Sequence, residues 1–190
     1  EEAPNHSDLL TLARKMGFFN GYRSEQSNST LGGADGASDD NAYGTLGVAA
    51  YTIELGENGF YSTCASFENT IWPDNLPALI YAAKASRKPY ELASGPDVVN
   101  LPSNPILVAT GDSFVISGIA TDLRFNNNNL NINNSPEPTQ NITAVNAYLD
   151  VPSWLPGASA TALSAADGAF DSQLEDITGN IDVSGLAEGR

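Results

Sequence analysis

The sequence predicts an α/β fold over residues 1–92 followed by an all-β sandwich over residues 93–190. In the first part, two segments with helical spacing of apolar residues flank a short, continuous apolar run, and such a run is typical of a buried strand. Near Ala93 the composition changes, and from there on short β-type runs alternate with Gly, Pro, Asp and Asn. Many short strands separated by turn residues indicate an antiparallel sandwich.

The composition narrows the classes of protein to which the chain can belong. Its 190 residues, of which 41% are hydrophobic, allow one large or two small domains with cores of their own. There are 8 Lys and Arg residues against 23 Asp and Glu residues, so the net charge is −15. Binding of nucleic acid or of an anionic membrane depends on Lys and Arg, and this balance argues against both. It fits a secreted or periplasmic protein that attracts cationic substrates.

The N-terminal part is predicted to begin with a helix and a long loop. Ser7 or Asp8 gives a capping signal, the apolar residues that follow are spaced as in a helix, and Gly17 is expected to end it. Residues 20–46 are rich in Gly, Ser, Asn and Asp. A loop of this length in a compact domain is functional or mobile.

The apolar run at residues 47–53 is predicted to lie in a central strand over residues 47–55. It is short and bounded by Gly, it ends in the carboxylate Glu54, and Gly56 breaks the pattern. A carboxylate among apolar neighbours is costly, so Glu54 either pairs with a basic residue at the sheet edge or has a functional role. The pattern alone leaves both interpretations open.

A second helix and then a series of short strands follow. Asp74 or Asn75, with Pro77, is expected to open the helix, and Pro89 is expected to end it. Residues 93–96 are typical of a linker. The predicted strands beyond it are residues 106–109, 113–120, 144–149, 158–163, 169–175 and 178–183.

The stretch from Asp39 to Tyr61 resembles the C-terminal part of the catalytic domain of the zinc carboxypeptidases (carboxypeptidase A/T-like). The resemblance rests on the segment Asp-Asp-x-Ala-Tyr-Gly, the run Tyr-Thr-Ile-Glu-Leu and the Gly-Phe-Tyr that follows, and it covers residues 8–92. The predicted second helix matches the last helix of that domain, and similar β modules follow it in some bacterial secreted members. The resemblance implies a metallocarboxypeptidase of mixed-sheet fold that removes C-terminal residues from a peptide or protein substrate.

The resemblance also implies roles for individual residues. The glutamate at the position of Glu54 is the general base that activates the zinc-bound water, and Thr52 aligns beside the specificity pocket. An ungapped alignment back from Glu54 puts Asp39 at the floor of that pocket and Asp40 at a structural aspartate, although a one-residue gap would exchange these roles. An acid at the floor would select Lys or Arg, because a buried cation must be paired. An aspartate in a loop is otherwise usually a turn former.

The chain does not contain the ligands of a catalytic zinc. A zinc hydrolase needs three protein ligands, whereas His6 is the only histidine and Cys64 the only cysteine. We expect His6 to be solvated or to cap the first helix, and Cys64 to be a buried, inert thiol. The resemblance therefore implies that Zn²⁺ belongs to a parent enzyme whose zinc ligands, with the N-terminal portion of the catalytic domain, lie outside this chain. In the β part, Asp122 and Glu137 are weaker candidates for binding calcium.

One further position departs from the pattern of the family. Its members carry a catalytic tyrosine on the loop ahead of the general base, and here Leu31 stands at that position. Tyr22, the nearest tyrosine upstream, better matches a structural Asn-Gly-Tyr element. A second interpretation therefore stays open, namely a non-catalytic binding or accessory module that retains the hydrolase scaffold. For the chain by itself, we expect an exposed apolar face where the rest of the sheet would pack.

Overall fold

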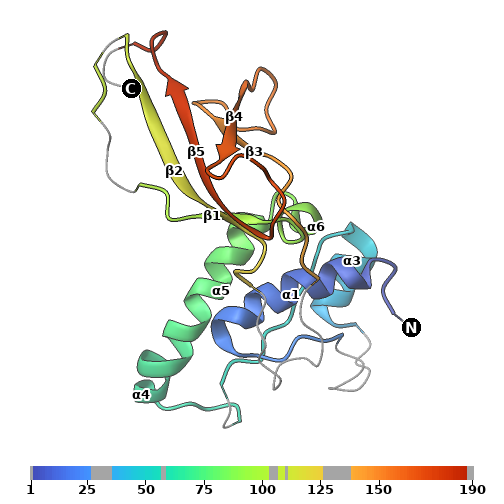
Figure 1. Ribbon diagram of the computed structural model, residues 1–190. Coiled ribbons are helices and arrows are strands. Elements are labelled where there is room, and N and C mark those ends of the chain that lie inside the picture. The colour runs from blue at the N-terminus through green and yellow to red at the C-terminus, as the bar shows by residue number, and fades with distance from the viewer. Residues whose placement is uncertain are drawn as a thin grey trace. The chain divides into compact units, whose positions relative to one another are not determined.

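The computed structural model describes residues 2–26, 36–56, 59–102, 107–109, 111–125 and 138–187. These residues divide into two units, one made of residues 2–95 and the other of the described residues from Pro96 onward. Helices build the first unit, and a single curled, antiparallel sheet builds the second (Figure 1). The predicted combination of helices with antiparallel strands is confirmed.

The elements keep the labels of Figure 1. The helical elements of the first unit are α1 (His6–Asn20), α3 (Ser38–Leu46), α4 (Cys64–Ser66), the π-helix η1 (Phe67–Ile71), α5 (Trp72–Ala85) and α6 (Pro89–Leu92). The strands of the second unit are β1 (Asp97–Val99), β2 (Ser113–Thr121), β3 (Val145–Tyr148), β4 (Ala160–Ala165) and β5 (Leu174–Asp182). Leu31 and Glu137, which the sequence singles out, lie outside the described residues.

The first predicted helix is confirmed, but it is longer than expected. Helix α1 runs through Gly17 to Asn20, and Gly21 ends it in the left-handed conformation (φ 72°), where its N–H donates to the carbonyl of Gly17. This is the usual C-terminal cap of a helix, for which glycine carries no steric penalty. The helix begins at His6, after Asn5, rather than at Ser7 or Asp8.

The prediction of a continuous loop over residues 20–46 is wrong for its last part, where α3 forms. Asp39 and Asp40 lie in the first turn of this helix. Their negative charges stabilise the helix there, because the N-terminal end of a helix dipole is positive. Gly47 caps the other end in the left-handed conformation (φ 67°) and donates its N–H to the carbonyl of Tyr43, 3.0 Å away. Favourable ends thus support a helix whose composition suggests a loop.

The predicted strand at residues 47–55 is also wrong, because this segment is irregular. A strand needs a neighbouring strand to bond its backbone groups, and no described residue among 2–95 belongs to a strand. The run is not buried on both faces either, since Val48 and Leu55 are each 50% exposed. Side chains of other elements hold the segment in place, as described below for Tyr51.

The second predicted helix is confirmed as α5, with different ends. The turn α4 and the π-helix η1 lead into it, so helical structure begins before Asp74. Helix α5 ends at Ala85, and Pro89 does not end it but occupies the first turn of α6. Proline suits that place because its missing N–H would have no partner inside the helix.

The core of the first unit lies where α1 packs against α5. It contains Leu12 and Met16 from α1, Ala78 and Ala85 from α5, and Ala93 just after α6, all at most 5% exposed. The alanines of α5 let the two helices approach closely. Because Leu12 and Met16 face α5, a different part of the α1 surface, which includes Leu9 and Ala13, is left to line the pocket described below.

The second unit is one sheet with the strand order β1-β2-β5-β4-β3, antiparallel throughout. The predicted strands at 113–120, 144–149 and 158–163 correspond closely to β2, β3 and β4. Those at 169–175 and 178–183 are replaced by the single strand β5, residues 107–109 are not in a strand, and β1 follows the predicted linker directly. The described residues form one curled sheet rather than the two packed sheets of a sandwich (Figure 1).

The second core belongs to the curled sheet and the segments next to its strands. Ala120, Ile142, Leu163, Ile177 and Ile181 are its buried members. Gly179 in β5 lets Leu163 cross the strand, since a Cβ atom at this position would lie 2.4 Å from Leu163 Cδ2. In the same unit the Asp122 carboxylate, a weaker candidate for calcium binding, accepts a hydrogen bond of 2.7 Å from the backbone N–H of Gln140.

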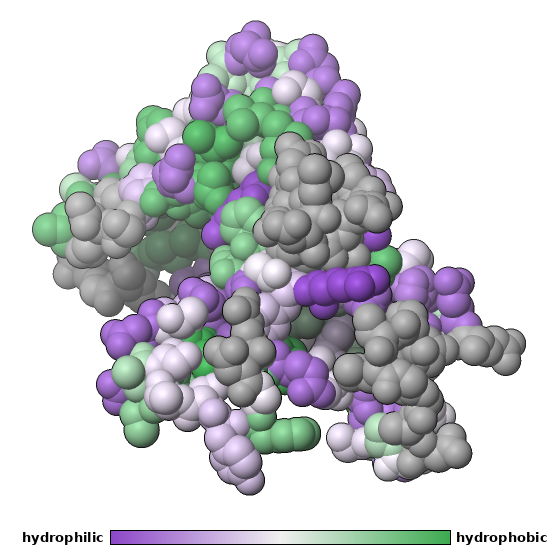
Figure 2. Space-filling view, turned by 90° about the horizontal axis from the view of Figure 1, so that it is seen from below, coloured by the Kyte–Doolittle hydropathy of each residue, from purple (hydrophilic) through white to green (hydrophobic). Residues whose placement is uncertain are grey.

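Several large apolar side chains of the first unit are exposed, although the described residues of this unit form no sheet whose open face could be recognised. Phe60 and Tyr61 are 98% and 94% exposed, and Phe67 and Trp72 are each 46% exposed. The space-filling view shows hydrophobic residues at the surface among hydrophilic ones (Figure 2). Among the described residues, no helix is long and apolar enough to cross a membrane.

Candidate functional site

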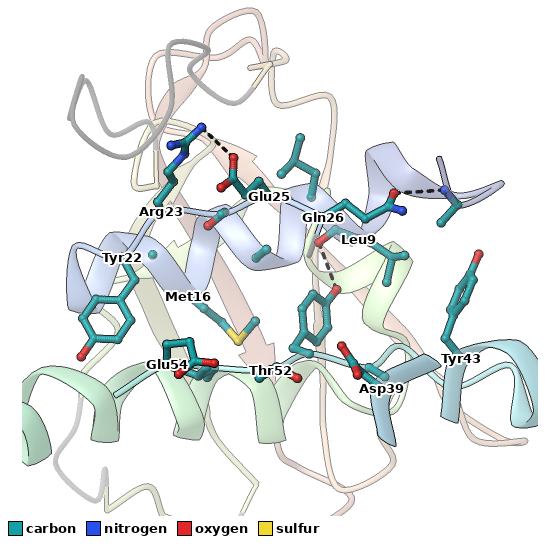
Figure 3. A pocket seen from close by; sticks show the side chains of 18 of the residues that line it. Leu9, Met16, Tyr22, Arg23, Glu25, Gln26, Asp39, Tyr43, Thr52 and Glu54 are labelled. Carbon is teal, nitrogen blue, oxygen red and sulfur yellow. Dashed lines mark hydrogen bonds and ion pairs between the residues drawn. The ribbon is translucent and has the colours of Figure 1, made fainter. Parts of the chain in front are cut away.

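A pocket of about 500 Å³ lies within the first unit and is lined only by residues 3–56. One wall is the face of α1 that carries Leu9, Ala13 and Met16. The facing wall is the irregular segment after α3, and Figure 3 shows Thr52 and Glu54 on it, across the pocket from Leu9 and Met16. The first turn of α3 contributes Asp39. The pocket therefore joins an apolar wall to a wall that carries carboxylates.

The spacing of residues along α1 explains its wall. His6, Leu9, Leu10, Ala13 and Gly17 all line the pocket, and they follow one another at intervals of one, three or four residues. Residues three and four apart share a face of a helix. The same spacing predicts the helix from the sequence, and in the structure the stripe extends back to His6.

Two side-chain hydrogen bonds hold the facing wall. The Tyr51 hydroxyl donates to the carbonyl of Leu9 at 3.0 Å, and the Gly56 N–H donates to the Tyr22 hydroxyl at 2.9 Å. Burial, and to a smaller extent the nearby Tyr90, raises the pKa of Tyr51 above its usual range. The segment that carries Thr52 and Glu54 is thus tied to the N-terminal part of the chain on both sides of these residues.

The three predicted site residues line the same pocket. Thr52 and Glu54 are exposed and Asp39 is half-buried. Asp40, the alternative to Asp39, is exposed and lines the pocket as well. Glu54 is therefore not the buried end of a strand but a carboxylate at the edge of a pocket. Within the described part of the chain, no hydrogen bond or ion pair of the side chains of Asp39, Asp40 or Glu54 is found.

Sequence reasoning missed other residues of the pocket. Arg23 lines it but pairs with Glu25 at 2.7 Å, so its charge is already balanced. Tyr22 was interpreted as a structural residue, yet its ring lies at the pocket, on the side of Glu54 (Figure 3). His6 is half-buried at the start of α1 and also lines the pocket. For Tyr22 no signal in the sequence alone indicated this place, because its neighbours are polar loop residues.

A polar network supports the end of the pocket at Tyr22. Asn75 of α5 is 2% exposed. Its amide oxygen accepts from the Asn20 side chain at 3.0 Å, and its amide nitrogen donates to the Ile71 carbonyl at 2.8 Å and to the Tyr22 hydroxyl at 3.2 Å. A buried amide with its partners satisfied holds its neighbours in fixed positions. The network connects α1 and α5 with Gly56.

The described residues do not provide a metal site. They contain no group of three His, Cys, Asp or Glu side chains that could hold a metal ion. Cys64 is exposed at the start of α4, which corrects the expectation of a buried thiol. The side chains present therefore do not fit a zinc ion bound by this part of the chain alone.

Comparisons with protein-family models, with curated protein sequences and with solved structures found no match. The chemistry of the pocket itself is defined by its two walls. Apolar side chains of α1 can cover the stem of a ligand, while carboxylates on the opposite wall favour a positive charge. Such a pocket suits a ligand that has an apolar body and a cationic end.

Proposed function

We propose that this chain supplies the general base and the side-chain pocket of a metallocarboxypeptidase that removes C-terminal residues from peptides. One observation carries the proposal. Glu54, Thr52 and Asp39, the residues to which the resemblance gives roles, come from two separate segments and line one pocket. Asp39 belongs to α3, whereas Thr52 and Glu54 belong to an irregular segment. Neither their positions in the sequence nor their secondary structure makes it necessary that they line the same pocket.

The residues of the chain suggest a division of tasks. Glu54 would take a proton from a water molecule in the pocket and pass it to the leaving amine, the usual work of a general base. Asp39 would pair with the cationic side chain of the residue to be removed, and Leu9 and Met16 would cover its aliphatic stem. Thr52, between the two carboxylates in Figure 3, would contact the same side chain.

Zinc belongs to this proposal only as a cofactor of a longer protein. The described residues do not fit a zinc ion, as shown above, so its ligands would lie outside this chain. The reading frame that encodes the chain tests this point. A His-x-x-Glu pair and a later histidine encoded upstream of Glu1 would support the proposal, and a reading frame without them would favour the binding module.

The decisive experiment is the Glu54→Gln variant of the zinc-loaded protein that contains this chain. Glutamine keeps the shape of the side chain but cannot accept the proton, so turnover of a peptide should fall by at least ~10²-fold. Glu68→Gln is the matched control, since Glu68 is an exposed carboxylate on η1 and does not line the pocket. Turnover of Glu54→Gln within a factor of two of the parent would remove Glu54 from the mechanism.

A further inference from the structure

Strand β2 of the second unit has an open edge. The strand is nine residues long, and on one side it pairs with β5 along its whole length (Figure 1). On the other side it pairs with β1, but only from Ile119 to Thr121. The part of this side from Ser113 to Ser117 therefore has no neighbouring strand among the described residues.

The hydrogen bonds show which residues of β2 turn their backbone groups toward the open edge. In an antiparallel pair, alternate residues bond to the partner strand, and the residues between them point away from it. The Val183 N–H donates to the Asp112 carbonyl at 3.3 Å, and the Asp122 N–H donates to the Gln173 carbonyl at 2.9 Å. Both bonds continue the register of β2 with β5. The even-numbered residues of β2 therefore bond to β5, and the odd-numbered residues point to the other side.

Three odd-numbered residues lie along the open edge, namely Ser113, Val115 and Ser117. Ile119, the next one, has Val99 of β1 opposite it, whereas no described strand lies opposite the first three. Ser113 and Ser117 are exposed, and Val115 is 67% exposed. Three N–H donors and three carbonyl acceptors are thus spaced as another strand requires.

This edge lacks the features that usually prevent pairing. Proteins protect an exposed edge strand with charged side chains, proline or a bulge. Residues 113–118 (Ser-Phe-Val-Ile-Ser-Gly) include no charged residue and no proline, and their register with β5 is continuous. Phe114 and Ile116 pack against the second core, which holds the strand in place. A strand held in this way can pair with a further strand without being ordered first.

We propose that the open edge of β2 binds an extended basic peptide as a sixth strand of the sheet. Backbone hydrogen bonds to Ser113, Val115 and Ser117 supply the affinity, as in other cases of strand addition. The proposal concerns the second unit alone. It goes beyond the proposed function and does not depend on it.

The charge of the second unit determines that the partner is basic. Among the described residues of this unit, Arg124 is the only Lys or Arg, whereas nine are Asp or Glu. Asp182 of β5 is exposed and lies directly opposite Ser113, and Asp176 is exposed on the same face of β5. Because neighbouring strands lie about 4.8 Å apart, a long lysine side chain on the added strand extends across β2 toward Asp182.

The two faces of β2 define the pattern of the peptide. Residues directly opposite each other in a sheet share a face. Positions of the peptide opposite Ser113, Val115 and Ser117 therefore lie on the exposed face, beside the carboxylates of β5, and suit Lys or Arg. Positions opposite Phe114 and Ile116 lie on the core face and suit apolar residues. A second copy of the chain, with its net charge of −15, is repelled instead.

The test uses the 190-residue chain and the probe acetyl-Lys-Val-Lys-Val-Lys-amide in a titration followed by nuclear magnetic resonance. The backbone amide signals of Ser113, Val115 and Ser117 should shift. Methylation of the three lysine backbone nitrogens removes the donors that face β2 and should weaken binding at least about tenfold. Methylation of the two valine nitrogens, which point away from β2, should change it less than about threefold. The peptide with Glu in place of each Lys should bind at least about tenfold more weakly.

Val115→Pro tests the same contact from the side of the protein. Proline is tolerated in an edge strand where its nitrogen faces away from the neighbouring strand. The variant removes the central donor of the open edge but leaves Phe114 and Ile116 paired with β5, so it should weaken binding of the lysine peptide at least about fivefold. Val115→Thr is the matched control, because it keeps the N–H and the branched side chain, and its affinity should stay within about twofold of the parent.

Hydrogen exchange of the free chain needs no variant and stands if Val115→Pro does not fold. The amides of Val115 and Ser117 should exchange at least about tenfold faster than those of Phe114 and Ile116. Equally slow exchange would overturn the proposal, because another part of the chain or a second copy would then cover the edge. Absence of binding, equal binding of the two methylated peptides, or equal binding of the Lys and Glu peptides would also overturn it. So would shifts confined to the pocket residues of the first unit.

Discussion

Among single residues, Asp39 and Asp40 are neighbouring carboxylates that differ in how far they are buried. Both line the pocket from the first turn of α3, but Asp39 is half-buried and Asp40 is exposed. Partial burial strengthens the interaction with an opposite charge, because less water screens it. This difference favours Asp39 as the partner of a cationic side chain, in agreement with the ungapped alignment.

If the parent protein is active, it should prefer peptides that end in Lys or Arg over peptides that end in Leu or Phe. An apolar side chain would leave Asp39 without a partner, and a penalty of about 1–3 kcal/mol gives roughly 5- to 150-fold discrimination. The kcat/KM values of matched peptides ending in Arg and Phe measure this ratio. Asp39→Ala should abolish the preference and Asp40→Ala should keep it. The opposite result would show that the two aspartates have exchanged roles.

Because of Tyr51, the first unit should become less stable as the pH rises into the alkaline range. Its hydroxyl donates to Leu9, and burial raises its pKa in the folded state. A raised pKa means that the folded state holds the proton more tightly than the unfolded state, so stability is fully present below the unfolded value of about 10 and falls as the pH rises beyond it. Denaturant unfolding at pH 8 and pH 10.5 should therefore show a larger loss in the parent than in Tyr51→Phe. Equal losses would show that this phenol ionises as freely in the folded chain as in the unfolded chain.

Among the elements, the packing of β4 on β5 depends on Gly179 of β5, because the side chain of Leu163 in β4 lies directly against this glycine. A Cβ atom at Gly179 would lie 2.4 Å from Leu163 Cδ2 and 3.4 Å from Leu163 Cα. Gly179→Ala should therefore destabilise the second unit by about 1–3 kcal/mol, the usual range for overpacking. Gly185→Ala is the control, because no atom lies within 4 Å of the added Cβ there. Hydrogen exchange of the β5 amides measures both, and a stability of Gly179→Ala equal to that of Gly185→Ala would show that Leu163 moves aside at no cost.

The elements also show what the sequence can predict and what it cannot. Helices α1 and α5 were predictable because an apolar stripe at helical spacing depends on the segment alone. Helix α3 was not, since Ser, Asp, Asn and Gly favour loops and its support comes from its two ends. The apolar run at residues 47–53 resembles a strand, but pairing depends on a neighbour that no pattern within the run can reveal. For the same reason β5 could not be joined from two shorter predicted strands.

The candidate site was predictable in part for a similar reason. Glu54, Thr52 and Asp39 were identified through resemblance, and all three line the pocket. Tyr22 was assigned a structural role, because its contact with the pocket depends on Asn75, which lies 53 residues away in the sequence. Contacts between residues so far apart in the sequence depend on how α1 packs against α5. The sequence pattern predicts which face of each helix is apolar, but it does not predict which residues of the two helices meet.

At the scale of the whole molecule, the chain should not bind zinc by itself. The described residues lack a group of three metal-binding side chains, and the sequence has one histidine and one cysteine. After incubation with zinc and removal of the excess, elemental analysis of the 190-residue chain should find far less than one zinc per chain. A stoichiometric zinc that resists desalting would contradict this and would mean that residues outside the described ranges complete a site.

The exposed thiol of Cys64 makes the chain a convenient object for single-molecule work. It is the only cysteine, it is exposed, and it lies outside the pocket lining. A maleimide dye would therefore attach at one known position, and a biotin attached there would tether every molecule to a surface through the same residue. The same property sets a condition for storage, because without a reducing agent two chains can couple through their thiols into a covalent pair.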